Sequence, residues 1–471
     1  MPRGHSRALP QVLTVAQMRA AEAGLIAGGA TVESLMGLAG AGAGEYVHRI
    51  AATRKATVLC GPGNNGGDGY VIAQHLFALD VPVRVIAALP PKTPAAMAAR
   101  AAFGGEVTDG LPAKLPHGDV FVDCLFGSGL TRAVDNALFG MLIALCDRHH
   151  HRIAIDMPSG IDSDRGAVLN PELPAFDLTI ALGAWKHAHF AMPAAALMGD
   201  LRLVDIGCAA QPDAAQLLQR PYLGAPAPDA HKYTRGLLTI VGGAMPGASL
   251  LSASAARHAG AGYVRLIVGA DPGPVPHDLV VVHDTPEQVL GDKRIAAVLV
   301  GPGLGRDGTA RERLRAAMAA GFPTVVDADA LMLLRQGQIT GAATVLTPHA
   351  GELAALERAF GLRGDGLKRD RAVALAAASG AVVVAKGPDT VIAAPDGRLI
   401  VAPRASPWLS VAGTGDVLAG IVASRLAVHH DPARAAAEGV WLHGEAAQIA
   451  GPAFAATDLA EAVHLAVRGA V

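Results

Sequence analysis

The stretch Val411-Ala412-Gly413-Thr414-Gly415-Asp416-Val417-Leu418-Ala419-Gly420 places three small residues directly before a run with helical character. We expect a helix from Val417 to Leu426. Backbone N–H groups at a helix N-terminus lack partners, and the helix dipole adds partial positive charge there. Because glycine lets an anion approach the backbone closely, the residues from Gly413 to Gly415 predict a phosphate-binding turn.

The carboxylate of Asp416 does not suit a simple anion site, because it would repel a phosphate. A carboxylate here fits a base that takes a proton from a hydroxyl reacting at the phosphate. The alternative is that Thr414 or Asp416 only caps the helix. The stretch alone leaves both interpretations open.

Length and composition restrict the class of protein. A chain of 471 residues is too long for one ordinary domain, so we expect two or three. Lys and Arg number 39 against 41 Asp and Glu, a balance that favours neither nucleic acid nor an anionic membrane as a partner. The four cysteines are far apart and form no CxxC, which is typical of reduced thiols in a cytoplasmic protein. We therefore expect a cytoplasmic protein that binds neither nucleic acid nor membranes.

One uncharged stretch, Leu237 to Ala256, is long enough to cross a bilayer. Gly242-Gly243, Pro246 and Gly247 interrupt it, so we expect a buried strand, a glycine-rich turn and the start of a helix instead. Nearer the N-terminus, Arg19 and Glu22 break the apolar pattern that a signal peptide would need.

In the first half, three apolar strands each run into a loop of small and polar residues. These strands are Thr57–Cys60, Val120–Cys124 and Ile153–Asp156. Continuously apolar strands are typical of a parallel sheet, whose C-terminal edge gathers such loops. We expect the first loop to run from Gly61 to Gly69, before a helix from Tyr70 to Leu79. The edge would bring together Asn65, Asp68, Asp123, Arg132, Asp156 and Ser159.

The first loop also matches the GxGxxG pattern at Gly61, Gly63 and Gly66. A dinucleotide fold of the ordinary kind wants an acid at the end of the next strand, which here ends in Leu89-Pro90 instead, so that interpretation is disfavoured. An Asp inside an apolar strand, such as Asp123, needs a partner. A cation bound by the oxygens of Asn65, Asp123 and Ser159 would supply one, and the alternative is that Asp123 caps a neighbouring turn.

Two further segments carry predictions. We interpret the run His149-His150-His151 as the solvated end of a helix before the next strand. Prolines gather between Gly207 and Asp229, which indicates an interdomain linker. The predicted domains are therefore 1–208 and 230–471, joined by 209–229.

In the second half, strands again end in loops. We expect strands at Leu237–Val241, Tyr263–Val268, Ala296–Val300, Thr344–Leu346 and Val382–Ala385, and a hairpin that turns at Asp396-Gly397. No Walker A sequence occurs, so the candidate nucleotide site is Gly413–Gly415 with Lys386 and Thr390 nearby. A second GxGxxG match, at Gly303, Gly305 and Gly308, has Asp327 at the end of the next strand. A nicotinamide-binding Rossmann unit therefore stays open for this region.

Taken together, these motifs resemble the bifunctional NAD(P)H-hydrate repair enzymes, over nearly the whole chain. The first half resembles the epimerase domain in Asn64–Gly69, Phe126–Leu130 and Asp156–Gly160. The second half resembles the ADP- or ATP-dependent dehydratase in His231–Tyr233, Gly301–Gly305, Asp327–Leu331, Thr347–His349, Lys386-Gly387 and Gly413–Asp416. The implied fold is α/β with two domains, an N-terminal Rossmann-like αβα sandwich and a C-terminal ribokinase-like α/β domain.

The resemblance implies metabolite repair. NADH and NADPH can gain water across the nicotinamide ring, which gives R and S hydrates (NADHX and NADPHX). The epimerase interconverts the two, and the dehydratase returns the S form to the reduced cofactor at the expense of ADP or ATP. Relatives with both halves in one chain tend to use ADP, so we expect ADP here, with Mg²⁺. We also expect a homo-oligomer.

Carried onto the first half, the resemblance implies a potassium ion held by Asn65, Asp123 and Ser159. Asp156 is our candidate for acid–base work in epimerisation. The implied hydrate contacts are Asn64, Asn65, Gly66, Gly67, Asp68, Gly127, Ser128, Gly129, Leu130, Thr131, Arg132, Ala133 and Asp156.

In the second half, Asp416 is the implied base for phosphoryl transfer to the hydroxyl of the hydrate, after which the phosphate can leave. The implied hydrate contacts are Ala248, Gly303, His349 and Asp416. The implied nucleotide contacts are Lys386, Gly387, Pro388, Asp389, Thr390, Gly413, Thr414 and Gly415.

Two segments depart from the family pattern, and one other function fits the second half. Gly242–Gly247 lacks the aromatic residue expected after the paired glycines, and Gly269–Leu290 is short. Both lie near the expected nicotinamide pocket, next to Ala248. The alternative function is a ribokinase-type small-molecule kinase with a regulatory, ligand-binding N-terminal domain.

Overall fold

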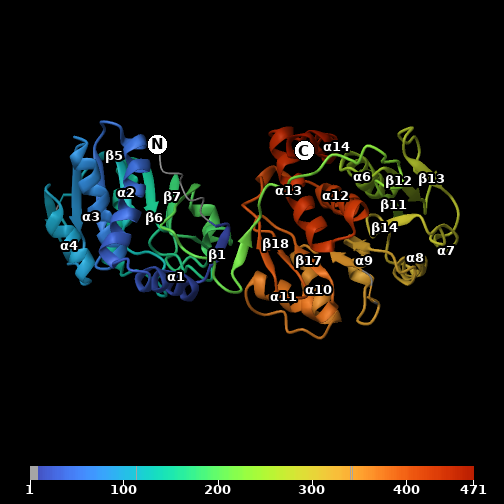
Figure 1. Ribbon diagram of the computed structural model, residues 1–471, viewed down its shortest axis with the longest axis horizontal. Helices are drawn as coiled ribbons and strands as arrows, with labels where there is room; N and C mark the ends of the chain where they lie inside the picture. The colour runs from blue at the N-terminus through green and yellow to red at the C-terminus, as the bar shows by residue number, and fades with distance from the viewer. Residues whose placement is uncertain (1–8, 113, 340, 342) are drawn as a thin grey trace. The chain divides into compact units, whose positions relative to one another are not determined.

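The computed structural model describes residues 9–112, 114–339, 341 and 343–471. The chain divides into two compact units, Met1–Gln216 and Leu217–Val471, which we call unit 1 and unit 2. Both are α/β structures built on largely parallel sheets (Figure 1), so the predicted fold class is confirmed.

Unit 1 is built on a seven-stranded parallel sheet in the order β4-β3-β2-β5-β6-β7-β9. Its central strands are uniformly buried, as expected when both faces are covered. The strands are β2 (Ala56–Cys60), β3 (Val83–Ala87), β4 (Val107–Asp109), β5 (Gly118–Cys124), β6 (His149–Ile155), β7 (Leu178–Leu182) and β9 (Asp200–Val204). Separately, β1 (Gln11–Leu13) pairs with β8 (Trp185–Lys186) and with β10 (Ala215–Leu217).

Helices cover both faces of this sheet. Side chains of α2 and α3 pack with Val58 and Cys60 of β2 on one face, whereas α5 packs with Leu59 and Phe121 on the other. Alternate residues of a strand point to opposite faces, so a single apolar strand serves both cores. The helices are α1 (Val15–Ala27), α2 (Val32–Ala51), α3 (Asn64–Ala78), α4 (Pro94–Ala102) and α5 (Asn136–Asp147), with short 3-10 turns at His187–His189 and Ala194–Leu197.

The start of α3 corrects the prediction of a long loop before Tyr70. The helix begins at Asn64, so the polar run lies in its first turns. A Cβ on Gly66 would lie 1.9 Å from the carbonyl oxygen of Gly61, and one on Gly69 would lie 2.8 Å from Cys60 Sγ. The glycines therefore let the helix approach the sheet closely, rather than forming a flexible loop.

The histidine run was also predicted wrongly. Residues 149–155 form β6, and the ring of His149 is buried between Leu145 and Thr57. Its Nδ1 lies 2.7 Å from the carbonyl oxygen of Leu145 and its Nε2 lies 2.9 Å from Thr57 Oγ1. Because both ring nitrogens have partners, the ring is tolerated inside the protein.

Unit 2 contains a larger sheet with the strand order β13-β12-β11-β14-β15-β16-β17-β18-β19. Strands β11 to β17 all pair in parallel, and β18 and β19 add an antiparallel hairpin next to β17. The strands are β11 (Leu237–Val241), β12 (Tyr263–Ile267), β13 (Val280–Val282), β14 (Ile295–Val300), β15 (Thr324–Val326), β16 (Thr344–Leu346), β17 (Val382–Ala385), β18 (Val391–Ala393) and β19 (Leu399–Val401).

Figure 1 shows α6, α12, α13 and α14 on one side of the unit 2 sheet and α8 to α11 on the other. The buried core beneath α12 joins Leu418, Val422 and Leu426 to side chains of β11 and β14. The helices are α6 (Pro246–His258), α7 (Pro286–Val289), α8 (Gly308–Ala319), α9 (Ala328–Leu333), α10 (Ala350–Ala359), α11 (Lys368–Ser379), α12 (Thr414–His429), α13 (Pro432–Ala450) and α14 (Ala456–Ala470), with a 3-10 turn at Pro407–Leu409.

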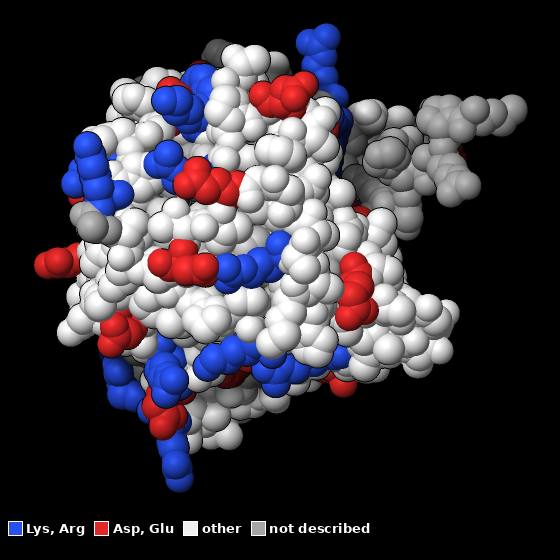
Figure 2. Space-filling model, turned by 90° about the vertical axis from the view of Figure 1, so that its left-hand side faces the viewer, with Lys and Arg blue, Asp and Glu red and all other residues white. Residues whose placement is uncertain are grey.

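The apolar stretch Leu237–Ala256 consists of strand β11, a turn and most of α6, as the sequence predicts. Within the described ranges, no single helix is long and apolar enough to cross a membrane. The bent pair α1 and α2 passes that test only on combined length and composition. On the face of unit 1 shown in Figure 2, acidic and basic side chains are intermingled.

Candidate active sites

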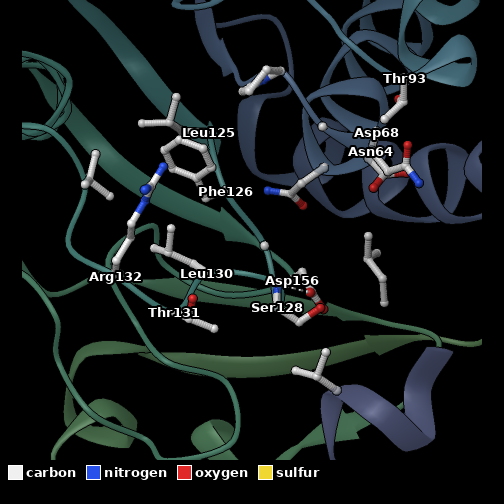
Figure 3. A pocket seen from close by; sticks show the side chains of 18 of the residues that line it. Asn64, Asp68, Thr93, Leu125, Phe126, Ser128, Leu130, Thr131, Arg132 and Asp156 are labelled. Atoms are coloured by element: carbon white, nitrogen blue, oxygen red, sulfur yellow. Dashed lines mark hydrogen bonds between the residues drawn. The ribbon is translucent and has the colours of Figure 1, made fainter.

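Unit 1 has a cavity of about 1030 Å³ where the loops after β2, β5 and β6 meet (Figure 3). Most of the residues predicted to contact the hydrate line this cavity, which we call the unit 1 pocket. They are Asn64, Asn65, Asp68, Gly127, Ser128, Gly129, Leu130, Thr131, Arg132, Ala133 and Asp156. The parallel sheet therefore brings the predicted set together at its C-terminal edge.

Two members of the predicted set do not line the pocket. Gly66 lies against the backbone of Gly61, and a Cβ on Gly67 would lie 2.5 Å from Met36 Cε. Both positions are needed for the close packing of α3. Their place in the motif is therefore explained by packing as well as by any ligand.

Asp156 is held in a fixed position at the end of β6. Its φ of 65° lies in the left-handed region, which is uncommon for a residue other than glycine. Lys186 Nζ lies 2.5 Å from Asp156 Oδ1, and the Ser128 N–H donates to Oδ2 at 3.0 Å. Burial raises the pKa of Asp156, but the charge and hydrogen bond of Lys186 outweigh burial, so the pKa lies below its usual value.

Lys186 is a site residue that the sequence interpretation missed. Its side chain is 2% exposed, and its Nζ also donates to the carbonyl oxygen of Leu182 at 2.6 Å. His189 supports the pair, because its Nδ1 accepts from the Lys186 N–H at 2.9 Å and its Nε2 lies 2.8 Å from the Asp156 carbonyl oxygen. Burial, followed by the charge of Lys186, lowers the pKa of His189 to about 4, so the ring is neutral. The sequence did hold one sign of this role, because Lys186 is the single charged residue in the mostly apolar run that follows β7.

Helix α1 supplies one wall of the unit 1 pocket, which was not predicted either. Val15, Met18, Arg19 and Glu22 line it. Burial is the main cause that raises the pKa of Glu22, and the charge of Lys186 opposes it. Burial also raises the pKa of Asp68 well above its usual value, and the nearby charge of Asp156 adds to that shift.

The three residues predicted to hold potassium lie around the turn after β5. Asp123 Oδ1 accepts from the Leu125 N–H at 3.0 Å and the Ser159 hydroxyl at 2.8 Å, and Oδ2 accepts from the Ser159 N–H at 2.8 Å. Asp123 therefore caps a turn, which was the alternative interpretation. Burial raises its pKa to about 6, against the opposing effect of the hydrogen bonds from Ser159 and Leu125.

The amide of Asn65 makes this cluster compatible with a cation. Its Oδ1 and Nδ2 are buried and have no hydrogen-bond partner among the described residues, although buried polar atoms nearly always have one. A Cβ on Gly127 would lie 3.2 Å from Asn65 Cγ, so the amide lies against the same turn that Asp123 and Ser159 bind. An oxygen-ligated ion would satisfy this amide, and the donor set suits a hard cation.

In unit 2, Asp416 lies in the first turn of α12 near a half-buried lysine, Lys386. Lys386 Nζ lies 2.7 Å from Asp327 Oδ1 and 3.8 Å from Glu352 Oε2, and a Cβ on Gly415 would lie 3.4 Å from the same Nζ. Burial raises the pKa of Asp416 to about 7, and Asp327 adds to this shift while Lys386 opposes it. A carboxyl with a pKa near neutrality is suited to act as a general base.

The turn before α12 leaves the N-terminus of the helix without a side-chain cap. Gly413 is the N-cap, with a φ of 92°. The Thr414 hydroxyl instead donates to the carbonyl oxygens of Leu409 and Val411. The purely structural interpretation, in which Thr414 or Asp416 caps the helix, is therefore wrong.

A cavity of about 650 Å³ lies beside this turn, and we call it the unit 2 pocket. The predicted nucleotide residues that line it are Lys386, Gly387, Pro388, Thr390, Thr414 and Gly415. Asp389 does not line it, because its carboxylate pairs with Lys368 Nζ at 2.6 Å, and Gly413 lies just outside. The sequence interpretation missed the wall from α13, which includes Trp441 and His443. Burial lowers the pKa of His443 to about 4.

The remaining predicted hydrate contacts lie outside the unit 2 pocket. A Cβ on Gly303 would lie 3.2 Å from Ala248 Cβ, so these two positions are adjacent. The Ser252 hydroxyl on the same helix, α6, donates to the Asp416 carbonyl oxygen. His349 is the N-cap of α10, and its Nε2 lies 3.5 Å from Glu352 Oε1. The Ser252 contact joins α6, which carries Ala248, to the start of α12, whereas His349 contacts Glu352 of α10.

The contacts of Asp327 bear on the Rossmann interpretation of the second half. Its Oδ1 accepts from the Thr347 hydroxyl and from Lys386 Nζ, both at 2.7 Å. The carboxylate is therefore engaged with the lysine of the unit 2 pocket, rather than free to bind a ribose as that fold requires.

Comparison with known proteins gives one match for each half of the chain. A family model described as NAD(P)H-hydrate dehydratase matches residues 238–466, and a second, described as YjeF-related protein N-terminus, matches residues 32–188. The bifunctional NAD(P)H-hydrate repair enzyme Nnr of Gloeobacter violaceus is 34% identical and covers 92% of this chain and 92% of its own. The enzyme of the same name from Salinibacter ruber is 33% identical and covers 96% of this chain and 95% of its own.

Among solved structures, the ADP/ATP-dependent NAD(P)H-hydrate dehydratase from Bacillus subtilis, co-crystallised with ATP and Mg²⁺, is 27% identical to this chain. It covers 53% of this chain and 95% of its own, with a TM-score of 0.48.

Proposed function

This chain belongs to the family of bifunctional NAD(P)H-hydrate repair enzymes, and from this we propose how its two units divide the work. Unit 1 epimerises the R and S hydrates of NADH and NADPH. Unit 2 dehydrates the S hydrate to the reduced cofactor at the expense of a nucleotide. Relatives that match more than nine-tenths of the chain and are named bifunctional NAD(P)H-hydrate repair enzymes support this function. They do not favour a kinase with a regulatory N-terminal domain.

The observation that carries the dehydratase assignment is the position of Asp416. A carboxyl with a pKa of about 7 stands at a helix N-terminus, beside Lys386 and next to a pocket of nucleotide size. Hydroxide leaves the ring poorly, whereas a phosphate leaves well. Asp416 takes the proton of the hydroxyl while the backbone N–H groups after Gly413 and the Lys386 ammonium stabilise the transferring phosphoryl group.

We propose these site assignments as they were made from the sequence. The hydrate in unit 2 contacts Ala248, Gly303, His349 and Asp416. The nucleotide contacts the Lys386–Thr390 loop and the Gly413–Gly415 turn, where Asp389 acts through its pairing with Lys368. Residues 1–208 form the epimerase domain, 209–229 the linker and 230–471 the dehydratase domain.

We also propose the cofactors. Potassium is held by Asn65, Asp123 and Ser159, and the unpartnered Asn65 amide supports this. When bound, the ion supplies a fixed positive charge at the wall of the unit 1 pocket, which favours an anionic ligand. ADP is the preferred nucleotide, with Mg²⁺ held largely by its phosphates, as is usual for magnesium. This fits the finding that no three acidic, His or Cys side chains among the described residues are arranged to hold a metal.

We also propose that the protein is cytoplasmic and forms a homo-oligomer. The four cysteines are all buried free thiols, which agrees with a reducing, cytoplasmic location. A homo-oligomer is expected from the resemblance. Sedimentation of the purified chain would test the assembly.

The test of the function mixes the purified chain with both epimers of NADH hydrate, potassium and Mg²⁺, with and without ADP or ATP. The near-ultraviolet absorbance of the restored dihydronicotinamide reports the product. Nucleotide-dependent recovery of all the hydrate is the expected result. Recovery of the S epimer alone would contradict the unit 1 assignment, and no recovery would contradict the unit 2 assignment.

A further inference from the structure

Two carboxyl groups in the unit 1 pocket have no hydrogen-bond partner among the described residues. Asp68 lies in the second turn of α3 and is only 7% exposed, and Glu22 comes from α1. Both line the cavity. Asp68 as a residue is more than nine-tenths buried, yet its carboxyl lines the cavity without a protein partner and is therefore available to a ligand.

Asp156, our sequence-based candidate for acid–base work, is in the opposite situation. Lys186 occupies one of its oxygens and the Ser128 N–H the other. His189 fixes its backbone. A carboxylate bound in this way holds a fixed negative charge and is poorly placed to exchange a proton with a substrate.

We propose that Asp68 and Glu22 are the two catalytic residues that exchange protons with the hydrate during epimerisation, one on each face of the nicotinamide ring. The Lys186–Asp156 ion pair is the fixed charge beside them, and Lys186 is its positioning residue. This inference rests on the proposed epimerase function of unit 1. It changes the role of Asp156 from acid–base catalyst to anchor.

The reaction needs two such groups because it inverts one carbon. One carboxyl gives its proton to the ring hydroxyl, the C–O bond breaks, and the nitrogen lone pair forms the C=N bond of a planar ring cation as water leaves. A water on the opposite face then forms the new C–O bond, and the C=N electrons return to nitrogen. The second carboxylate takes the proton of that water, so the proton passes from one carboxyl to the other, and the reverse reaction returns it.

The surroundings of the two groups suit this exchange. Asp68 is faced by the charges of Asp156, Glu22 and Lys186, and Glu22 by those of Lys186, Asp156 and Arg19. Burial is the leading cause that raises both pKa values. Both carboxyls therefore hold a proton more readily than an exposed carboxyl does, which favours exchange of a proton with a bound hydrate.

The test measures epimerisation of the separated R and S hydrates by the full chain and its D68N, E22Q and E33Q variants. Dehydration of pure S hydrate by unit 2 and thermal unfolding are recorded on the same samples. We expect D68N and E22Q each to slow epimerisation in both directions by about 10²-fold or more. E33Q, which removes an exposed carboxylate from the first turn of α2, keeps the wild-type rate. In ¹⁸O-labelled water, each inversion introduces one solvent oxygen.

The possible failures are distinguishable. A wild-type chain that does not epimerise would overturn the proposed function of unit 1 itself. A wild-type chain that does, with D68N and E22Q both folded and within threefold of its rate, would overturn the two-carboxyl inference. Inversion without uptake of ¹⁸O would overturn the C–O cleavage step. Since Glu22 lies on α1 and is less buried than Asp68, E22Q tests the inference even if D68N fails to fold.

Discussion

Asp156 in unit 1 directly follows strand β6, whereas Asp416 in unit 2 lies in the first turn of α12. Each lies near a lysine that solvent reaches little, Lys186 for Asp156 and Lys386 for Asp416. The pKa values of the two carboxyls nevertheless move in opposite directions. Lys186 contacts Asp156 directly, whereas Lys386 contacts Asp327 and reaches Asp416 only through space. A lysine in contact fixes a carboxylate as a charge, while a lysine shared with a second acid leaves the neighbouring carboxyl free to take a proton.

The largest expected effect concerns Asp416. The D416N variant should lower the rate of dehydration of S hydrate by about 10²- to 10⁴-fold, because it removes the general base. Initial rates with saturating ADP measure this. The matched control is D396N, which removes an exposed carboxylate from the β18–β19 turn and should leave the rate unchanged. A D416N rate within threefold of wild type would show that Asp416 is not the base.

The Lys186–Asp156 pair should behave as a structural unit. K186M leaves a buried carboxylate unpaired and should destabilise unit 1 by about 3–5 kcal/mol. The double variant D156N/K186M has no buried charge at this pair and should recover most of that loss. Hydrogen exchange of the backbone amides in the strands of unit 1 compares the stability of the single and the double variant. Equal losses in the single and double variants would mean that the pair is not coupled.

The pH dependence of dehydration sharpens the contrast. The pKa of Asp416 is raised to about 7, so the rate should fall about tenfold per pH unit below 7 and level off above it. The free energy of unfolding changes with pH in the opposite direction to the rate, because the folded chain holds a proton on Asp416 that the unfolded chain loses at lower pH. This contribution favours folding at acid pH and is lost as the pH rises from the ordinary carboxyl range to about 7. D416N should remove that slope, and a slope that persists would assign it to another group.

The smallest effect concerns the packing of α3. A Cβ on Gly66 would lie 1.9 Å from the Gly61 carbonyl oxygen, whereas one on Gly63 would meet nothing within 4 Å. We expect G66A to destabilise unit 1 by about 1–3 kcal/mol, because the backbone of α3 or of Gly61 must move to make room for the methyl group. We expect G63A to change the stability little. Thermal unfolding of the two variants measures the difference. Equal unfolding temperatures would mean that α3 does not need the close approach.

Strands of unit 2 were predictable because short apolar runs ended within two residues of a glycine or proline, as at Pro348 and Gly387. Thr344–Leu346 and Val382–Ala385 match the observed strands. The start of α3 could not be predicted, because a glycine-rich run is typical of a loop unless the sheet that it packs against is known. His149 was misplaced because its buried partners, Leu145 and Thr57, are visible only in the fold.

The candidate sites show the same limit. The loop residues of both pockets could be named from motifs, since consecutive parallel strands deliver them to one edge. Lys186, Glu22 and Trp441 belong to no motif, and they reach the pockets from segments distant in sequence. Only the tertiary structure brings these residues to the pockets.

The independence of the two units is tested most directly by mixing two full-length variants, D416N and D68N. Each is given both hydrates with ADP, alone and together. The predicted result is that D416N forms reduced cofactor at least about 10²-fold more slowly than the wild-type chain. D68N rapidly recovers only the S epimer initially present, and the mixture recovers all the hydrate. Rapid recovery of all the hydrate by either variant alone would contradict the division of labour between the units.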